Sequence, residues 1–154
     1  MREQELLELL QAKQLEASLG ARWDRFEAEF GVVLPFDYQW IVDQGDSIEL
    51  FSYLFLANPF TENGDFPTEN NPMLDFVRDE LVRIESDFDS VEISAENPLQ
   101  KVFPIGGTQN GEILLLLKTG DAWKVAVADR YYYEVEYFEM GLDEFLKSFI
   151  TGDV

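Results

Sequence analysis

Five consecutive apolar residues at positions 113–117 place the strongest constraint on how this chain folds. A strand with one face in water alternates apolar and polar side chains, because successive residues point to opposite faces of the sheet. A continuously apolar run of strand length instead indicates a strand that is covered on both faces. We therefore expect 113–117 to be a central strand of a sheet, with protein packed on each side.

Turn signals and alternation around this run predict further strands. Asn110-Gly111 is a hairpin-type pair just before the run, and Thr119-Gly120-Asp121 is a turn just after it. Short connections of this kind join antiparallel neighbours. The expected elements are strands at 101–105, 123–127 and 133–138, and a tight loop that Gly106-Gly107 and Asn110-Gly111 bracket.

The N-terminal part of the chain predicts helices. Apolar side chains recur at helical spacing in 3–17 and in 21–30, and Gly31 stands where a left-handed residue ends a helix. Leu34-Pro35 opens a third helix, because proline fits the first helical turn. The other expected elements are one strand at 48–57, a helix from Pro72 to about Ser86 and a closing helix from Leu142.

The order of these elements predicts the fold class. Helices come first, then a run of hairpin-linked strands, then one helix, which is typical of an α+β protein. We expect a central, mostly antiparallel sheet flanked by helices. No composition shift or linker divides the chain of 154 residues, so we expect a single domain over 1–154, with 1–19 as an N-terminal helical extension.

The charge of the chain bears on its function. It has 31 Asp and Glu against 11 Lys and Arg, a formal net charge of −20, and neither His nor Cys. The side chains most used as general bases, thiol nucleophiles and transition-metal ligands are therefore missing. So much negative charge also repels nucleic acid and anionic lipid and attracts basic partners. We expect a binding protein with no cofactor, no bound metal and no enzymatic activity.

Acidic residues are densest between positions 61 and 96. One interpretation is solubility or adaptation to high salt, and the other is an electronegative face that steers a cationic protein partner and pairs with its Lys and Arg side chains. Charge alone does not decide between them. The candidate partner-binding residues are Glu62, Asp65, Glu69, Asp75, Asp79, Glu80, Asp87 and Asp89.

Carboxylates alone could serve two other functions, namely glycoside hydrolysis and calcium binding. Glycoside hydrolysis needs only two of them, so composition does not exclude it, but among so many acids no pair stands out. A calcium loop that starts at Asp87 would need Gly at its sixth position and Glu at its twelfth. Those positions hold Glu92 and Pro98, so the calcium motif fails.

Three segments of the chain resemble the SUKH superfamily, which includes a yeast regulator of cell-wall synthesis and many bacterial toxin-immunity proteins. The first is Trp23-x2-Phe26-Glu27-x2-Phe30-Gly31-x2-Leu34-Pro35-x-Asp37-Tyr38-x2-Ile41-x3-Gly45. The second is Val102-Phe103-Pro104-Ile105-Gly106 followed by Asn110-Gly111-Glu112, and the third is Leu142-x2-Phe145-Leu146-x2-Phe149-Ile150. The resemblance covers about residues 18–150.

The resemblance implies an α+β domain that binds a protein and has no active site of its own. Its bacterial members look like cytoplasmic inhibitors of toxin domains, often nucleases. We therefore expect a cytoplasmic immunity protein that covers the basic, substrate-binding cleft of a cognate toxin. The alternative is a regulatory or scaffold module without a toxin partner. The N-terminal residues lack the apolar core of a signal peptide, in agreement with a cytoplasmic location.

Overall fold

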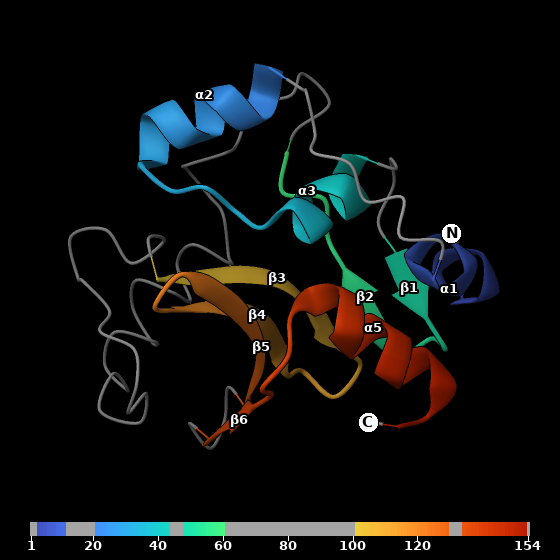
Figure 1. The fold of residues 1–154 in the computed structure, drawn as a ribbon. Coiled ribbons are helices and arrows are strands. Elements are labelled where there is room, and N and C mark those ends of the chain that lie inside the picture. Colours follow the sequence, from blue (N-terminus) through green and yellow to red (C-terminus); the bar gives the residue numbers. More distant parts are fainter. Residues whose placement is uncertain (1–2, 12–20, 44–47, 61–100, 130–133, 154) are drawn as a thin grey trace.

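A six-stranded antiparallel sheet forms the centre of the computed structural model shown in Figure 1. The structure describes residues 3–11, 21–43, 48–60, 101–129 and 134–153. Each strand pairs with its neighbours in sequence, so strand order in the sheet equals chain order. The strands are β1 (Ile48–Leu50), β2 (Leu54–Leu56), β3 (Val102–Thr108), β4 (Ile113–Thr119), β5 (Ala122–Asp129) and β6 (Glu134–Tyr137).

The described residues also form four helices, and the α+β class predicted above is therefore confirmed. The helices are α1 (Glu3–Gln11), α2 (Ala21–Phe30), α3 (Phe36–Asp43) and α5 (Leu142–Thr151). Helix α5 packs against α1, α3 and strand β5. None of the described helices is both long enough and apolar enough to cross a membrane.

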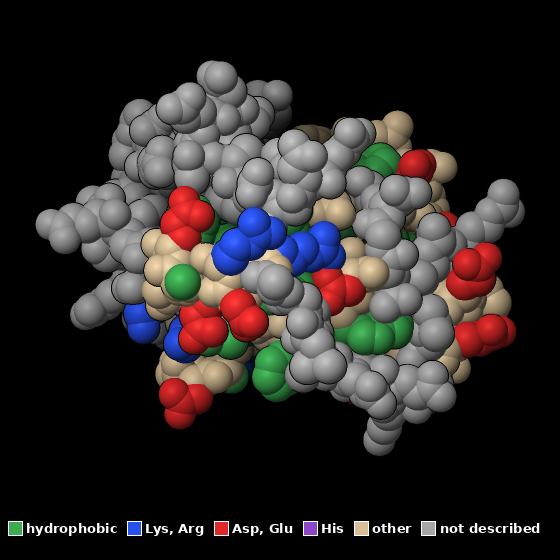
Figure 2. All heavy atoms as spheres, turned by 90° about the horizontal axis from the view of Figure 1, so that it is seen from above, with side chains coloured by type: hydrophobic (Ala, Val, Ile, Leu, Met, Phe, Trp, Pro, Cys, Tyr) green, Lys and Arg blue, Asp and Glu red, His purple; other side chains and the backbone are tan. Residues whose placement is uncertain are grey.

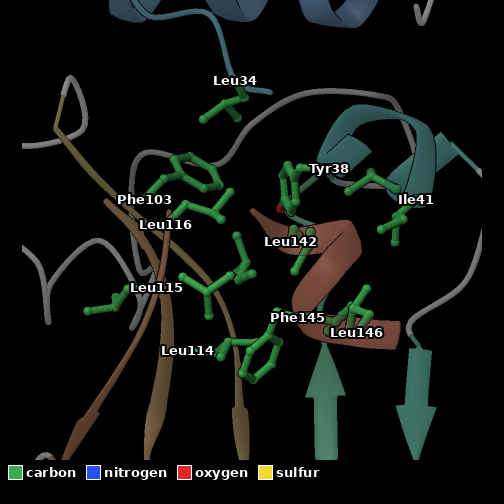
Figure 3. Close-up of a cluster of buried hydrophobic side chains, with 14 of the residues drawn as sticks. Leu34, Tyr38, Ile41, Phe103, Leu114, Leu115, Leu116, Leu142, Phe145 and Leu146 are labelled. Atoms are coloured by element: carbon green, nitrogen blue, oxygen red, sulfur yellow. The ribbon is translucent and has the colours of Figure 1, made fainter. Parts of the chain in front are cut away.

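Strand β4 is the central strand that the apolar run predicts. It lies between β3 and β5, and Leu114, Leu115 and Leu116 are fully buried. Figure 3 shows Leu114 and Leu116 directed toward the helices and Leu115 directed to the other side of the sheet. Both faces of β4 are therefore covered, which explains why its sequence does not alternate.

Aromatic rings join α2 and α3 to the sheet. Tyr38 of α3 lies edge-on to Trp23 of α2, with ring centres 6.1 Å apart. Phe103 of β3 lies 5.7 Å from Tyr38 and 5.6 Å from Phe26 of α2. Edge-to-face pairs at such distances stabilise beyond the area that they bury. The aromatic residues of the first SUKH-like segment are thus mainly core residues, of which Figure 3 shows Tyr38.

The prediction of one strand at 48–57 is wrong. The chain turns back within this range, so that β1 and β2 form a hairpin in which Leu50 pairs with Leu54. Phe51 and Ser52 occupy the turn with φ angles of 54° and 53°. Neither is glycine, asparagine or aspartate, the types that usually mark a turn with positive φ angles, and therefore alternation across the turn looks like one continuous strand.

The prediction that the strand at 101–105 ends at Ile105 and that Gly106-Gly107 borders a tight loop is also wrong, because both glycines lie within β3. Gly106 pairs with Leu56 of β2, and a Cβ built on it would lie 1.8 Å from the carbonyl oxygen of Phe55. Glycine is needed there because the backbone of β2 approaches too closely for any side chain. The turn between β3 and β4 lies at Asn110-Gly111, as expected, and Gly111 has a φ of 85°.

Asp37 connects α3 to the start of α5. The N-cap residue of α5 is Gly141, which has no side chain to accept a hydrogen bond. Asp37 Oδ2 accepts the backbone N–H of Asp143 instead, at 3.1 Å, and Asp37 Oδ1 accepts the N–H of Tyr38 at 2.7 Å. A carboxylate from a distant helix thus caps α5.

Burial raises the pKa of Asp37 above its ordinary value of 3.8, and the nearby Asp143 carboxylate raises it further. The two backbone N–H groups act in the opposite direction but do not outweigh the burial. The folded protein therefore holds this proton more tightly than the unfolded chain does. Stability contributed by Asp37 is present at low pH and is lost as pH rises from 3.8 through the raised pKa.

We expect Asp37→Asn to gain stability relative to the wild type as pH rises from about 3 to 7, because asparagine keeps an acceptor but carries no charge to desolvate. Asp37→Ala, which removes both acceptors, should cost about 1 kcal/mol. Urea unfolding of the three proteins across this pH range measures the difference. A wild-type advantage over Asp37→Asn that grows with pH would contradict the assignment.

Candidate partner-binding surface

The eight acidic residues predicted to bind a partner lie outside the described residues. They are Glu62, Asp65, Glu69, Asp75, Asp79, Glu80, Asp87 and Asp89, all within 61–100. The predicted helix at 72–86 also lies in this range. The surface analysed below is built from other parts of the chain.

Basic side chains on the described surface are largely engaged with acidic ones. Arg22 pairs with Asp43, Lys124 with Glu139, and Lys147 with Glu144. Figure 2 shows the molecule from above, where Lys and Arg side chains gather among Asp and Glu side chains. The guanidinium of Arg22 also lies 4.8 Å from the ring centre of Phe60. The described part of this face therefore carries both signs of charge.

Four large apolar side chains are exposed among the described residues. They are Val33 at 49%, Phe36 at 57%, Phe51 at 55% and Tyr137 at 42%. Single exposed apolar residues are common on proteins and need no function. Phe51 differs from the others in its backbone conformation and in its surroundings, which together single out the hairpin between β1 and β2.

The tip of this hairpin holds Phe51 in a left-handed conformation. The N–H of Tyr53 donates to the carbonyl of Leu50 at 3.0 Å, which closes the turn. The N–H of Phe51 donates to Oε1 of Glu3 in α1. Left-handed φ is unfavourable for a bulky residue, and such strain is of the order of 1–3 kcal/mol per residue. Glycine or asparagine would relieve this strain, so the backbone conformation of the turn does not favour phenylalanine at this position.

Three aromatic rings meet at the hairpin. Phe149 of α5 lies 5.8 Å from Phe51 and is stacked with Tyr53 at 6.4 Å, measured between ring centres. On its other side Phe149 stacks with the buried Phe145 at 6.3 Å. The exposed ring of Phe51 is thus supported by a column of aromatic residues that leads into the core. We call Phe51, Tyr53 and Phe149 the hairpin patch.

Hydrogen bonds orient the Tyr53 side chain. Its hydroxyl donates to Oε1 of Glu112 at 3.0 Å and accepts from Nδ2 of Asn110 at 3.2 Å. The hydroxyl of Thr108 donates to the same Glu112 oxygen at 3.0 Å. The turn between β3 and β4 therefore fixes Tyr53 and places a carboxylate beside the ring. Glu3 contributes a second carboxylate on the α1 side of the patch.

The hairpin patch combines features of a protein-binding surface. Aromatic side chains dominate the binding energy of many interfaces, especially where the supporting residues are fixed before binding. Neither 48–57 nor 108–112 contains Lys or Arg, so the charges that these segments contribute are negative. The patch is therefore suited to an apolar contact on a partner that carries basic residues around it.

Among the described residues, no group of three or more Asp or Glu side chains is placed to hold a metal ion. A small cavity beside Tyr38, lined also by Ile41 and Val42, has a volume of about 10 Å³. That is room for roughly one water molecule. The buried Tyr38 hydroxyl finds no partner in the described part of the chain, and burial raises its pKa.

Comparison with known proteins gives no match among family models, curated proteins or solved structures. The features that bear on function are therefore the geometry of the described residues and the resemblance of the three sequence segments.

We expect Phe51→Asn to change the free energy of unfolding by less than about 1 kcal/mol. Asparagine tolerates the left-handed turn, so relief of strain offsets the lost ring contact of about 0.5–1.5 kcal/mol. The control Phe145→Ala removes a buried ring from the same column and should cost about 3–5 kcal/mol. Both values come from urea unfolding. A loss of 2 kcal/mol or more in Phe51→Asn would show that this ring serves stability instead of binding.

Proposed function

We propose that this protein is an immunity protein of the SUKH type, which binds a cognate bacterial toxin domain and covers its basic active cleft. The hairpin patch would provide the apolar contact, and the excess of acidic residues would attract and pair with the toxin. The observation that carries the proposal is the exposed ring of Phe51, which the fold holds in a strained turn and supports with Phe149.

Net charge supports the cationic nature of the partner. A formal charge of −20 favours encounter with a basic surface at low ionic strength. Electrostatic steering can raise association rate constants from about 10⁵–10⁶ to 10⁸–10⁹ M⁻¹s⁻¹. The cleft of a nuclease is basic because it binds phosphates, so an acidic protein that fits it would also exclude the nucleic acid. No reaction is required of the inhibitor itself.

The sequence resemblance supports the class of partner. Several residues of the first SUKH-like segment have structural roles here, since Trp23, Leu34 and Tyr38 are buried and Asp37 caps α5. Such residues favour the fold without locating the binding surface. Phe51 and Tyr53 lie between the first and second motif segments in sequence, at positions where immunity proteins of one fold can differ in order to recognise different toxins, whereas Phe149 belongs to the third segment.

The test is binding to the toxin domain encoded beside the gene, measured for two matched variants. Phe51 and Phe36 are almost equally exposed, at 55% and 57%. We expect Phe51→Ala to weaken binding by about 30-fold or more, as expected for an interface anchor that contributes 2 kcal/mol. Phe36→Ala should change it by less than about threefold. Association of the wild type should also slow steeply as salt approaches about 1 M, where the Debye length is about 3 Å.

Equal effects of the two variants, or no effect of Phe51→Ala, would reject the hairpin patch as the toxin-binding surface. Co-expression tests the function itself. An immunity protein rescues cells from the neighbouring toxin, whereas a regulatory or scaffold module does not. Failure of rescue together with binding to a nontoxic partner would favour the scaffold alternative.

A further inference from the structure

A second candidate site lies at β4, β5 and β6, whereas the hairpin of β1 and β2 is at the other edge of the sheet. A cavity of about 240 Å³ is lined by residues of β4, β5 and β6 and of the segment that follows β6. The lining residues are Leu117, Thr119, Lys124, Val125, Tyr137, Phe138 and Glu139. Its volume is just below the range of about 300–1,000 Å³ that is typical of drug-sized ligands, so it suits a smaller molecule.

The strand register explains how these side chains come together. Leu117 pairs with Lys124 across β4 and β5, and Ala126 pairs with Tyr137 across β5 and β6. Paired residues share a face of the sheet, as do residues two positions apart in a strand. Leu117, Lys124 and Tyr137 therefore lie on one face. It is the face of Leu115, which Figure 3 shows directed away from the helices.

The cavity lining contains one basic and one acidic side chain. Lys124 and Glu139 form an ion pair at its mouth, with exposed side-chain fractions of 35% and 82%. An exposed ion pair of this kind contributes little to stability, so a ligand can open it at low cost. A purely anionic ligand would meet Glu139, and a purely cationic ligand would meet Lys124. A ligand that carries both charges would satisfy both side chains at once.

The remaining lining adds an apolar wall and one unused polar atom. Leu117 and the ring of Tyr137 offer apolar contact, and Tyr137 is 42% exposed although it belongs to a strand. Oγ1 of Thr119 is buried and has no hydrogen-bond partner among the described residues. Buried hydroxyl groups are nearly always paired in folded proteins, so this residue of the cavity lining lacks the partner that such groups normally have.

We propose that this cavity binds a small zwitterion, namely a free α-amino acid with an apolar or aromatic side chain. Its carboxylate would pair with Lys124 and accept a hydrogen bond from Thr119, and its ammonium group would pair with Glu139. The side chain would lie against Leu117 and Tyr137. This site shares no residue with the hairpin patch, so the two proposals are independent.

Titration of the whole chain with L-phenylalanine, followed by ¹H–¹⁵N NMR, tests the proposal. Signals of 117–125 and 137–139 should shift. L-phenylalaninamide lacks the carboxylate and N-acetyl-L-phenylalanine lacks the ammonium group, so each should bind at least about tenfold more weakly, as expected on losing a charged hydrogen bond. Glu139→Gln should weaken L-phenylalanine binding to a similar extent.

Glu144→Gln is the matched control, because Glu144 pairs with Lys147 on α5 and does not line the cavity. It should leave the affinity unchanged. Thr119→Val, which keeps the shape and removes the hydroxyl, should also weaken binding. Unfolding curves confirm that each variant is folded. Absence of shifts at these residues, or equally tight binding of the amide, would overturn the proposal; the second result would mean that the cavity accepts a cationic group instead.

Discussion

Burial of β4 on both faces is the constraint on which the rest of the described structure depends. Its leucines can be removed from water only if β3 and β5 pair with it and if other parts of the chain cover both faces. Helix α5 packs against the sheet on the side of Leu114, and α3 joins it through the ring of Tyr38 (Figure 3). Asp37 then ties α3 to the first turn of α5. Hydrophobic burial thus fixes the layers, and hydrogen bonds fix how the helices meet.

Sequence patterns predicted the elements for which local turn and helix signals and the pattern of buried residues indicate the same structure. The apolar run of β4, the left-handed Gly31 after α2 and the apolar spacing of α5 all indicate the structures found. They failed where tertiary contacts overrule local signals. Gly106 resembles a loop residue, but it lies in β3 because the carbonyl of Phe55 occupies the space of a side chain.

The candidate site was less accessible to sequence reasoning than the fold. Phe51 and Tyr53 meet Phe149 only because α5 returns to the hairpin of β1 and β2, almost one hundred positions later in the chain. The turn at Phe51 has no glycine, asparagine or proline to announce it. The one hint of a hairpin in the sequence is length, because the ten-residue alternating segment is longer than most strands.

Electrostatic attraction and apolar contact would have separate roles in binding a partner. Net charge would govern how fast a basic partner arrives, and acidic residues are densest between positions 61 and 96. The hairpin patch would govern where that partner docks, because its rings are fixed by stacking and by the hydrogen bonds of Tyr53 before any partner binds. A protein of this kind would inhibit by covering a surface, without making or breaking a bond.

Amide hydrogen exchange of the protein, alone and with the toxin domain encoded beside it, shows whether the partner docks at the hairpin patch. Binding at the hairpin patch predicts slower exchange at the turn around Phe51 and at the end of α5 around Phe149 in the complex. Exchange at Val33, between α2 and α3, and at Phe36, the first residue of α3, should stay the same, although both side chains are exposed. Protection of these two residues with no change at the hairpin would contradict the central claim.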